Sequence, residues 1–121
     1  MASVRLRFHM VDAGSMAANI SSYGFFVRSV DNIGLEYTFT GTAATGTWTF
    51  FGSNDSVDGT STSGNWFTVT PTGTAPTNPA ASSGATFGVN FNQYPYDWLR
   101  VGYTFTSGTG SLTVIAVGKE I

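Results

Sequence analysis

The sequence contains no cysteine, one histidine and few charged residues. Without cysteine there are no disulfide bonds, thiolate metal sites or cysteine nucleophiles. Charged residues make up 10 % of the chain, and its five basic residues are too few for a phosphate-binding face. A net charge of −2 gives no long-range attraction to nucleic acid or to an anionic membrane. We therefore expect neither partner.

Long hydrophobic runs are missing as well. No segment approaches the roughly 20 apolar residues that a membrane-spanning helix needs. The first ten residues, MASVRLRFHM, hold no apolar stretch of signal-peptide length. We therefore expect neither a membrane span nor a secretory leader.

Aromatic residues, glycine, threonine and serine are abundant in the remaining sequence. Aromatics alone account for 15 % of the 121 residues. This composition is typical of an all-β protein with short strands and tight turns. A chain of this length is expected to form one domain with a core that needs no covalent cross-link.

The C-terminal stretch from Tyr96 to Ile121 has the clearest pattern. It reads YDWLRVGYTF, TSGTG and SLTVIAVGKEI, two strand-like runs around a glycine-rich turn, which predicts a β-hairpin. The second run is apolar on both faces, as expected for a central strand. The apolar face of the predicted hairpin pairs Phe105 with Leu112, Tyr103 with Val114 and Val101 with Ala116.

Shorter alternating runs precede this hairpin and predict further strands. A second hairpin is expected over 33–52, and Gly24 inside a strand suggests a bulge or a close backbone approach. About eight strands with turn signals every 8–12 residues predict an antiparallel β-sandwich, with jelly-roll and immunoglobulin-like topologies both open. We expect one domain over 1–121, with a mobile N-terminal strand (1–10) and a long loop (71–85), of a length that is usually functional or mobile. The other expected strands are 20–30, 33–40, 47–52, 65–70 and 86–92, with loops at 12–19 and 53–64.

Residues suited to catalysis are scarce. On its strand His9 shares a face with arginines, which are the wrong sign for metal binding or acid–base chemistry. Asn54, Asp55 and Asp58 resemble a calcium loop but lack its spacing and its terminal glutamate, so we interpret them as turn formers. We predict no catalytic residue, no metal and no cofactor, and therefore no enzyme.

The three tryptophans allow two interpretations. Trp48, Trp66 and Trp98 would form a sugar-binding platform if their rings were exposed, but rings at strand spacing favour the core. Trp98 is the best candidate for exposure, because it lies opposite the apolar face of the predicted hairpin. That register also places it near Lys119, within reach of a cation–π contact.

The N-terminal strand carries Arg5 and Arg7 on its polar face. Their simplest role is a solvated strand surface. If this strand lies at a sheet edge, it would instead pair with a neighbouring subunit, and the two arginines would set the specificity of that contact.

Several segments resemble small β-sandwich virion proteins of tailed bacteriophages. The similarity covers residues 33–121 and rests on GTWTFFGSND (46–55), NWFTV (65–69) and YPYDWLRVGYTFTSGTGSLTVIAVGKEI (94–121). It includes a strand that leads into Ser53, Asn54 and Asp55, and a late hairpin of the form W-L-R-V-x-Y-T-x-T-S-G-T-G-x-L-x-V before G-K. The first thirty residues and the 71–85 loop lie outside it.

This resemblance implies a structural protein of the virion, most plausibly a capsid decoration (cement) protein, which is assembled in the host cytoplasm. It implies the major capsid protein as partner and a homo-oligomer, with a trimer as our expectation. A carbohydrate-binding module of a phage tail or fibre is the alternative. The expected interface residues are Arg5, Arg7, Phe8, Pro76, Pro79 and Trp98.

Overall fold

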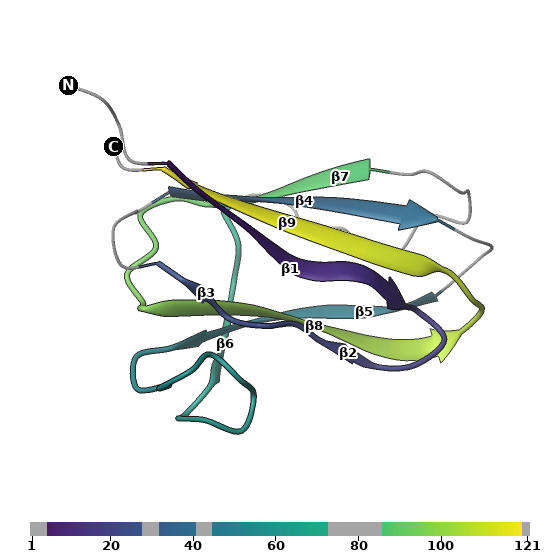
Figure 1. Cartoon of the computed structure of the whole chain (residues 1–121), viewed down its shortest axis with the longest axis horizontal. Coiled ribbons are helices and arrows are strands. Elements are labelled where there is room, and N and C mark those ends of the chain that lie inside the picture. The colour runs from purple at the N-terminus through teal and green to yellow at the C-terminus, as the bar shows by residue number, and fades with distance from the viewer. Residues whose placement is uncertain (1–4, 28–31, 41–44, 73–85, 120–121) are drawn as a thin grey trace.

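The computed structural model describes residues 5–27, 32–40, 45–72 and 86–119. Two antiparallel sheets face one another as the layers of a sandwich (Figure 1). This confirms the predicted β-sandwich. The strands are β1 (Arg5–Ser15), β2 (Ile20–Ser21), β3 (Phe25–Phe26), β4 (Asn32–Thr40), β5 (Thr45–Ser53), β6 (Phe67–Val69), β7 (Thr86–Phe91), β8 (Trp98–Ser107) and β9 (Ser111–Lys119).

The order of the strands decides between the two topologies that the sequence left open. Sheet A has the order β1-β9-β4-β7, and sheet B has the order β2-β8-β5-β6, with β3 also paired to β8. If β2 and β3 are counted as one interrupted strand, the chain passes from one sheet to the other at every connection except the one from β5 to β6. Because β2 and β3 are two short pieces along one edge of β8, this order is that of a jelly roll.

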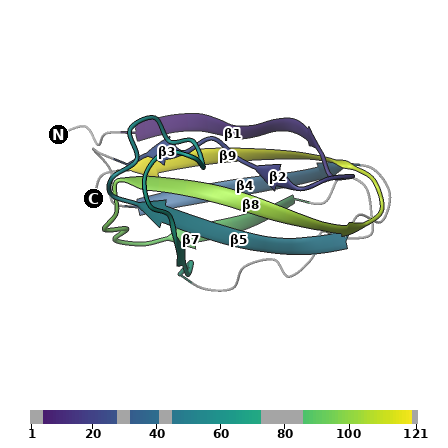
Figure 2. The same cartoon turned by 90° about the horizontal axis from the view of Figure 1, so that it is seen from below.

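The predicted C-terminal hairpin is wrong. β8 pairs with β5 and belongs to sheet B, whereas β9 pairs with β1 and β4 in sheet A. Seen from below, β8 and β5 run side by side across the sandwich (Figure 2). The predicted hairpin over 33–52 is wrong for the same reason, since β4 and β5 lie in different sheets. The described glycine-rich connection between β8 and β9 crosses between the layers instead of closing a ladder.

The predicted faces of these strands are nevertheless right. The side chains that we placed on one apolar face are buried, but they meet across the interior and not along a shared ladder. β9 is also central, as its two apolar faces predicted. The buried set from β8 and β9 comprises Leu99, Val101, Tyr103, Leu112, Val114 and Ala116, each exposed by 2 % or less.

The N-terminal strand is longer than predicted. β1 continues to Ser15 through two register shifts, one between His9 and Val11 and one between Val11 and Gly14. The first part of the expected 12–19 loop is therefore strand. Its first residue, Arg5, is paired with Lys119 near the end of β9. β1 forms one edge of sheet A, and its irregular register is a common way to make an edge unsuitable for unwanted pairing.

The strand predicted over 20–30 is broken into β2 and β3. Between them the Ser22 backbone N–H donates to Val101 O at 2.9 Å, and the Ser22 hydroxyl accepts from Val101 N at 2.8 Å. The expected close approach at Gly24 is confirmed. A Cβ atom added there would lie 2.8 Å from the carbonyl oxygen of Gly59.

The described residues include no helix that is long and apolar enough to cross a membrane.

Candidate interaction surfaces

The polar loop after β5 is built by its own side chains. Asp55 accepts hydrogen bonds from Asn65 N at 2.7 Å, Asn65 Nδ2 at 2.8 Å and Ser53 Oγ at 3.1 Å. The backbone N–H of Asn65 makes the largest contribution to lowering the pKa of this carboxyl group. Asp58 accepts from the Thr60 N–H and hydroxyl, which likewise lowers its pKa.

Hydrogen bonds within the loop thus account for both carboxylates, as expected of turn formers. Both oxygens of Asp55 accept hydrogen bonds within the loop. They take the place of the backbone–backbone hydrogen bonds that an irregular segment lacks. No group of three or more metal-binding side chains occurs among the residues that the structure describes.

Arg100 lies beneath this loop on the outer face of sheet B. It is 7 % exposed, and its Nη1 donates to Ser21 Oγ at 2.5 Å. The guanidinium carbon lies 4.4 Å from the Phe51 ring centre and 4.9 Å from that of Trp66. Burial lowers the pKa of Arg100. The Trp66 indole N–H donates to Thr60 O and Ser63 O at 3.0 Å each, which fixes the loop over the arginine.

Hydrogen bonds join three segments beside this loop, and we call four of their apolar residues the Trp98 patch: Tyr23, Phe26, Val57 and Trp98. Three of them are unusually exposed for their size, at 70 % for Tyr23, 41 % for Phe26 and 87 % for Val57. The ring of Phe26 stacks on the half-buried indole of Trp98, with centroids 4.7 Å apart. Trp98 joins the segments because its indole N–H donates to Ser56 O, next to Val57, at 3.1 Å.

The backbone beneath the Trp98 patch is held in place. The Gly24 N–H donates to Gly59 O at 2.9 Å, which ties the 22–26 segment to the 56–60 loop. Gly59 has a φ of 78°, and a Cβ atom there would lie 2.5 Å from the Trp98 ring. The Tyr94 hydroxyl donates to Trp98 O at 2.7 Å. The patch is therefore a fixed apolar surface, which an association would not need to order first.

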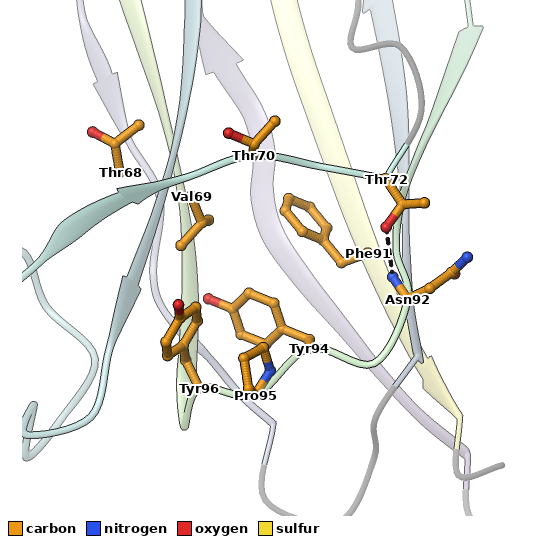
Figure 3. Close-up of a pocket in the computed structure, with 9 residues that line it drawn as sticks. All are labelled: Thr68, Val69, Thr70, Thr72, Phe91, Asn92, Tyr94, Pro95 and Tyr96. Carbon is orange, nitrogen blue, oxygen red and sulfur yellow. Dashed lines mark hydrogen bonds between the residues drawn. The ribbon is translucent and has the colours of Figure 1, made fainter.

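A pocket of about 300 Å³ lies at the opposite edge of sheet B, between the end of β6 and the turn that leads into β8 (Figure 3). Its lining is aromatic and uncharged. The Tyr94 and Tyr96 rings meet edge to face at 5.3 Å, and the Phe67 ring meets Tyr96 at 4.8 Å. Thr72 Oγ1 accepts from Asn92 N at 3.1 Å and closes one side. The lining residues are Thr68, Val69, Thr70, Thr72, Phe91, Asn92, Tyr94, Pro95 and Tyr96.

The expected N-terminal interface residues point in different directions. Arg7 is exposed on the outer face of sheet A, as is His9. Phe8 faces inward, where it packs against the core and stacks on Phe25 with ring centres 6.1 Å apart. Arg5 begins β1. Pro76 and Pro79 lie outside the described residues.

The tryptophans have three different environments. Trp48 packs against the core, with its ring 4.7 Å from Tyr37, which agrees with the interpretation as a core residue. Trp66 covers Arg100, and Trp98 belongs to the patch. The predicted contact between Trp98 and Lys119 rested on the hairpin register and is wrong. Lys119 pairs instead with Arg5 and Asn32, in the other sheet.

Tyr23, Phe26 and Val57 were not among the expected interface residues. In the sequence, Phe26 alternates with Phe25 and Val27 and so belongs to the other face of its strand, and Val57 is an isolated apolar residue in a polar loop. The positions of Phe26 and Val57 are the hint in the sequence that these two side chains are exposed. What joins them is the hydrogen bond between Gly24 and Gly59, which no periodic pattern encodes.

Solved structures share this fold at low sequence identity. The SPBc2 prophage-derived protein YomS matches with a TM-score of 0.59 at 11 % identity, covering 98 % of this chain and 96 % of that one. Structures of infectious bursal disease virus match with TM-scores of 0.52 for the Gx strain and 0.54 for the Gt strain, at 11 % and 13 % identity. In both, 98 % of this chain covers 32 % of the viral chain. No protein-family model and no curated protein matches the sequence.

Proposed function

We propose that this chain is a non-enzymatic structural protein of a bacteriophage virion, which decorates the outer capsid shell and binds the major capsid protein. The Trp98 patch carries the proposal, since a fixed and exposed apolar surface of this kind is characteristic of interaction sites. The phage-like sequence motifs and the likeness to a prophage-derived protein and to virus structures support a virion context.

The fold alone does not carry this proposal. Jelly rolls occur in viral capsids and also in lectins and enzymes. The patch adds apolar area that is removed from water when a partner covers it. A capsid shell offers many equivalent binding positions for such a surface. Weak contacts repeated over a lattice give strong total binding. The expectation of a trimer comes from the resemblance and remains a prediction.

Co-sedimentation with phage shells that lack this protein tests the proposal. Wild-type protein is expected to bind saturably, at a fixed ratio to the shell protein. Replacing Tyr23 and Val57 together by serine should weaken binding about tenfold or more, because each change removes apolar area from the contact. Phe67→Ser is the matched control, since it removes an exposed ring at the opposite edge of sheet B.

Point variants are preferable to removing residues 1–10. Residues 5–9 are paired with β9, so a truncation of residues 1–10 would remove about half of an edge strand of sheet A. Absence of saturable binding by the wild-type protein would contradict the proposal. Saturable quenching of tryptophan fluorescence by a glycan, without shell binding, would favour the carbohydrate-binding alternative.

A further inference from the structure

The outer face of sheet A has an apolar centre that no described segment covers. Ile115 and Val117 lie half-exposed on β9, the strand whose other face is buried in the core. The register aligns side chains in rows across all four strands. One row contains Arg7, Val117, Gly34 and Asn90, and the next contains His9, Ile115, Glu36 and Gly88.

Glycine leaves open space beside this apolar centre. A Cβ atom added at Gly88 would meet nothing within 4 Å, and one at Gly34 would meet only the Asn90 side chain, at 4.0 Å. Two shallow depressions of about 410 and 350 Å³ lie along Gly34 and Val117. Neither glycine is required by packing within the chain, so the space is available to a partner.

The charges beside the apolar centre are divided between its two sides, and exposed Lys119, two residues beyond Val117 on β9, lies at one end of the face. Arg7 lies on β1 and Glu36 on β4, on opposite sides of β9 and one row apart. At ordinary strand spacing the two backbones are about 10 Å apart across the sheet. A half-turn about an axis along β9 exchanges the two sides. It places the arginine of each copy over Gly34 of the other, one row from the glutamate.

We propose that the outer face of sheet A pairs with the same face of a second copy of this chain about a twofold axis. The face has the self-complementary arrangement of an isologous contact, with Ile115 and Val117 at the centre and an Arg7–Glu36 contact on each side. The two copies of Lys119 meet at one end of the axis, and this like-charge contact weakens the pairing. A threefold ring would join two different surfaces of each copy, so the geometry favours a dimer over the trimer that the resemblance suggested.

The size of the face sets the expected strength. Four strands of about nine residues cover roughly 15–20 Å by 30 Å, or about 500 Å² of flat surface. Stable interfaces bury about 800 Å² on each partner. We therefore expect a weak dimer with a dissociation constant in about the micromolar range. Pairing leaves the Trp98 patch uncovered, because that patch lies on sheet B, so this inference and the proposed function fail independently.

Sedimentation equilibrium of the whole chain at low salt tests the pairing by a charge exchange. The wild-type protein is expected to show a concentration-dependent monomer–dimer equilibrium. Arg7→Glu and Glu36→Arg should each weaken it about tenfold or more, because like charges then face each other. The double variant R7E/E36R should restore the wild-type equilibrium.

Thr104→Arg is the matched control, because it adds a charge at an exposed position on sheet B and should leave the dimer unchanged. Urea unfolding checks that all variants are folded, and their exposed positions predict that they are. A monomer at all concentrations or a trimer would overturn the inference. Single reversals without effect, or a double variant that does not recover, would also overturn it.

Discussion

The guanidinium carbon of Arg100 lies 4.4 Å from the centre of the Phe51 ring, and the two residues are direct cross-strand partners on β8 and β5. The arginine is therefore held between a strand and the loop that covers it, with Trp66 on the loop side. Its planar group suits this position, because a guanidinium is weakly hydrated and stacks on aromatic faces. The contact fastens the 54–66 loop to sheet B.

Arg100→Lys should therefore lower the free energy of unfolding by about 1–2 kcal/mol, because an ammonium group is costlier to bury and cannot stack. Arg100→Met should leave the free energy of unfolding almost unchanged. Methionine is of similar length and apolar, so it removes the buried charge and with it the need for polar partners. Urea unfolding measures both, with exposed Arg7→Lys as control. A loss above about 2 kcal/mol for the methionine variant would show that the charge itself stabilises the fold.

The carboxylates of the loop after β5 predict a dependence of stability on acid. Hydrogen bonding lowers the pKa of Asp55 below its ordinary value of 3.8 in the folded state. The ionised form thus contributes stability that is complete above this value and is lost as pH falls through the lower folded pKa. The urea midpoint should fall as the pH drops below about 4, and Asp55→Asn should flatten this fall. An unchanged pH profile in the variant would argue against the role of Asp55.

Two glycines provide a matched test of the backbone under the Trp98 patch. Gly59→Ala places a methyl group against the Trp98 ring at a positive φ, and should cost about 2 kcal/mol or more and alter tryptophan fluorescence. Gly88→Ala meets no neighbour and should be neutral or stabilise by about 0.5 kcal/mol. Equal effects at the two positions would contradict the packing described for Gly59.

The topology is testable by introduced disulfides, because the natural chain has no cysteine. Thr47 and Thr104 are exposed cross-strand partners on β5 and β8, at a spacing that a disulfide spans. T47C/T104C should oxidise within the monomer, as shown by its intact mass and loss of free thiols. A C-terminal hairpin would instead bring Thr104 beside Thr113, so T104C/T113C should stay reduced within one monomer. Oxidation of the T104C/T113C pair alone would support the predicted C-terminal hairpin and contradict the strand order described above.

The sequence predicted which way the strands face better than which strands pair. A pattern of apolar residues with a period of two shows which side chains are buried, as it does for Leu112, Val114 and Ala116. It does not show which strand lies beside them, because any neighbouring strand with an apolar face satisfies the same pattern. The TSGTG stretch looks like a hairpin turn and serves as a crossing between sheets. Tertiary pairing with β1 and β4 overrode the local turn signal.

The candidate surfaces were less predictable, because they depend on contacts between distant segments. Trp98 was named among the expected interface residues, which stays a prediction, but its neighbours in the patch come from residues 22–26 and from the loop at 56–60. The second surface, around Ile115 and Val117, was partly visible as a strand apolar on both sides. Only the sheet order shows that its outer side lacks a described cover.

The pairing of Arg5 with Lys119 brings the first and last described strands together at one corner of sheet A. A segment placed before Arg5 and one placed after Lys119 would therefore start from the same corner of the molecule. A short linker from Lys119 to Arg5 would permit a circular permutant, with new termini opened in the loop between β5 and β6. Such a permutant would keep every strand intact, and cargo at its new termini would lie beside the Trp98 patch.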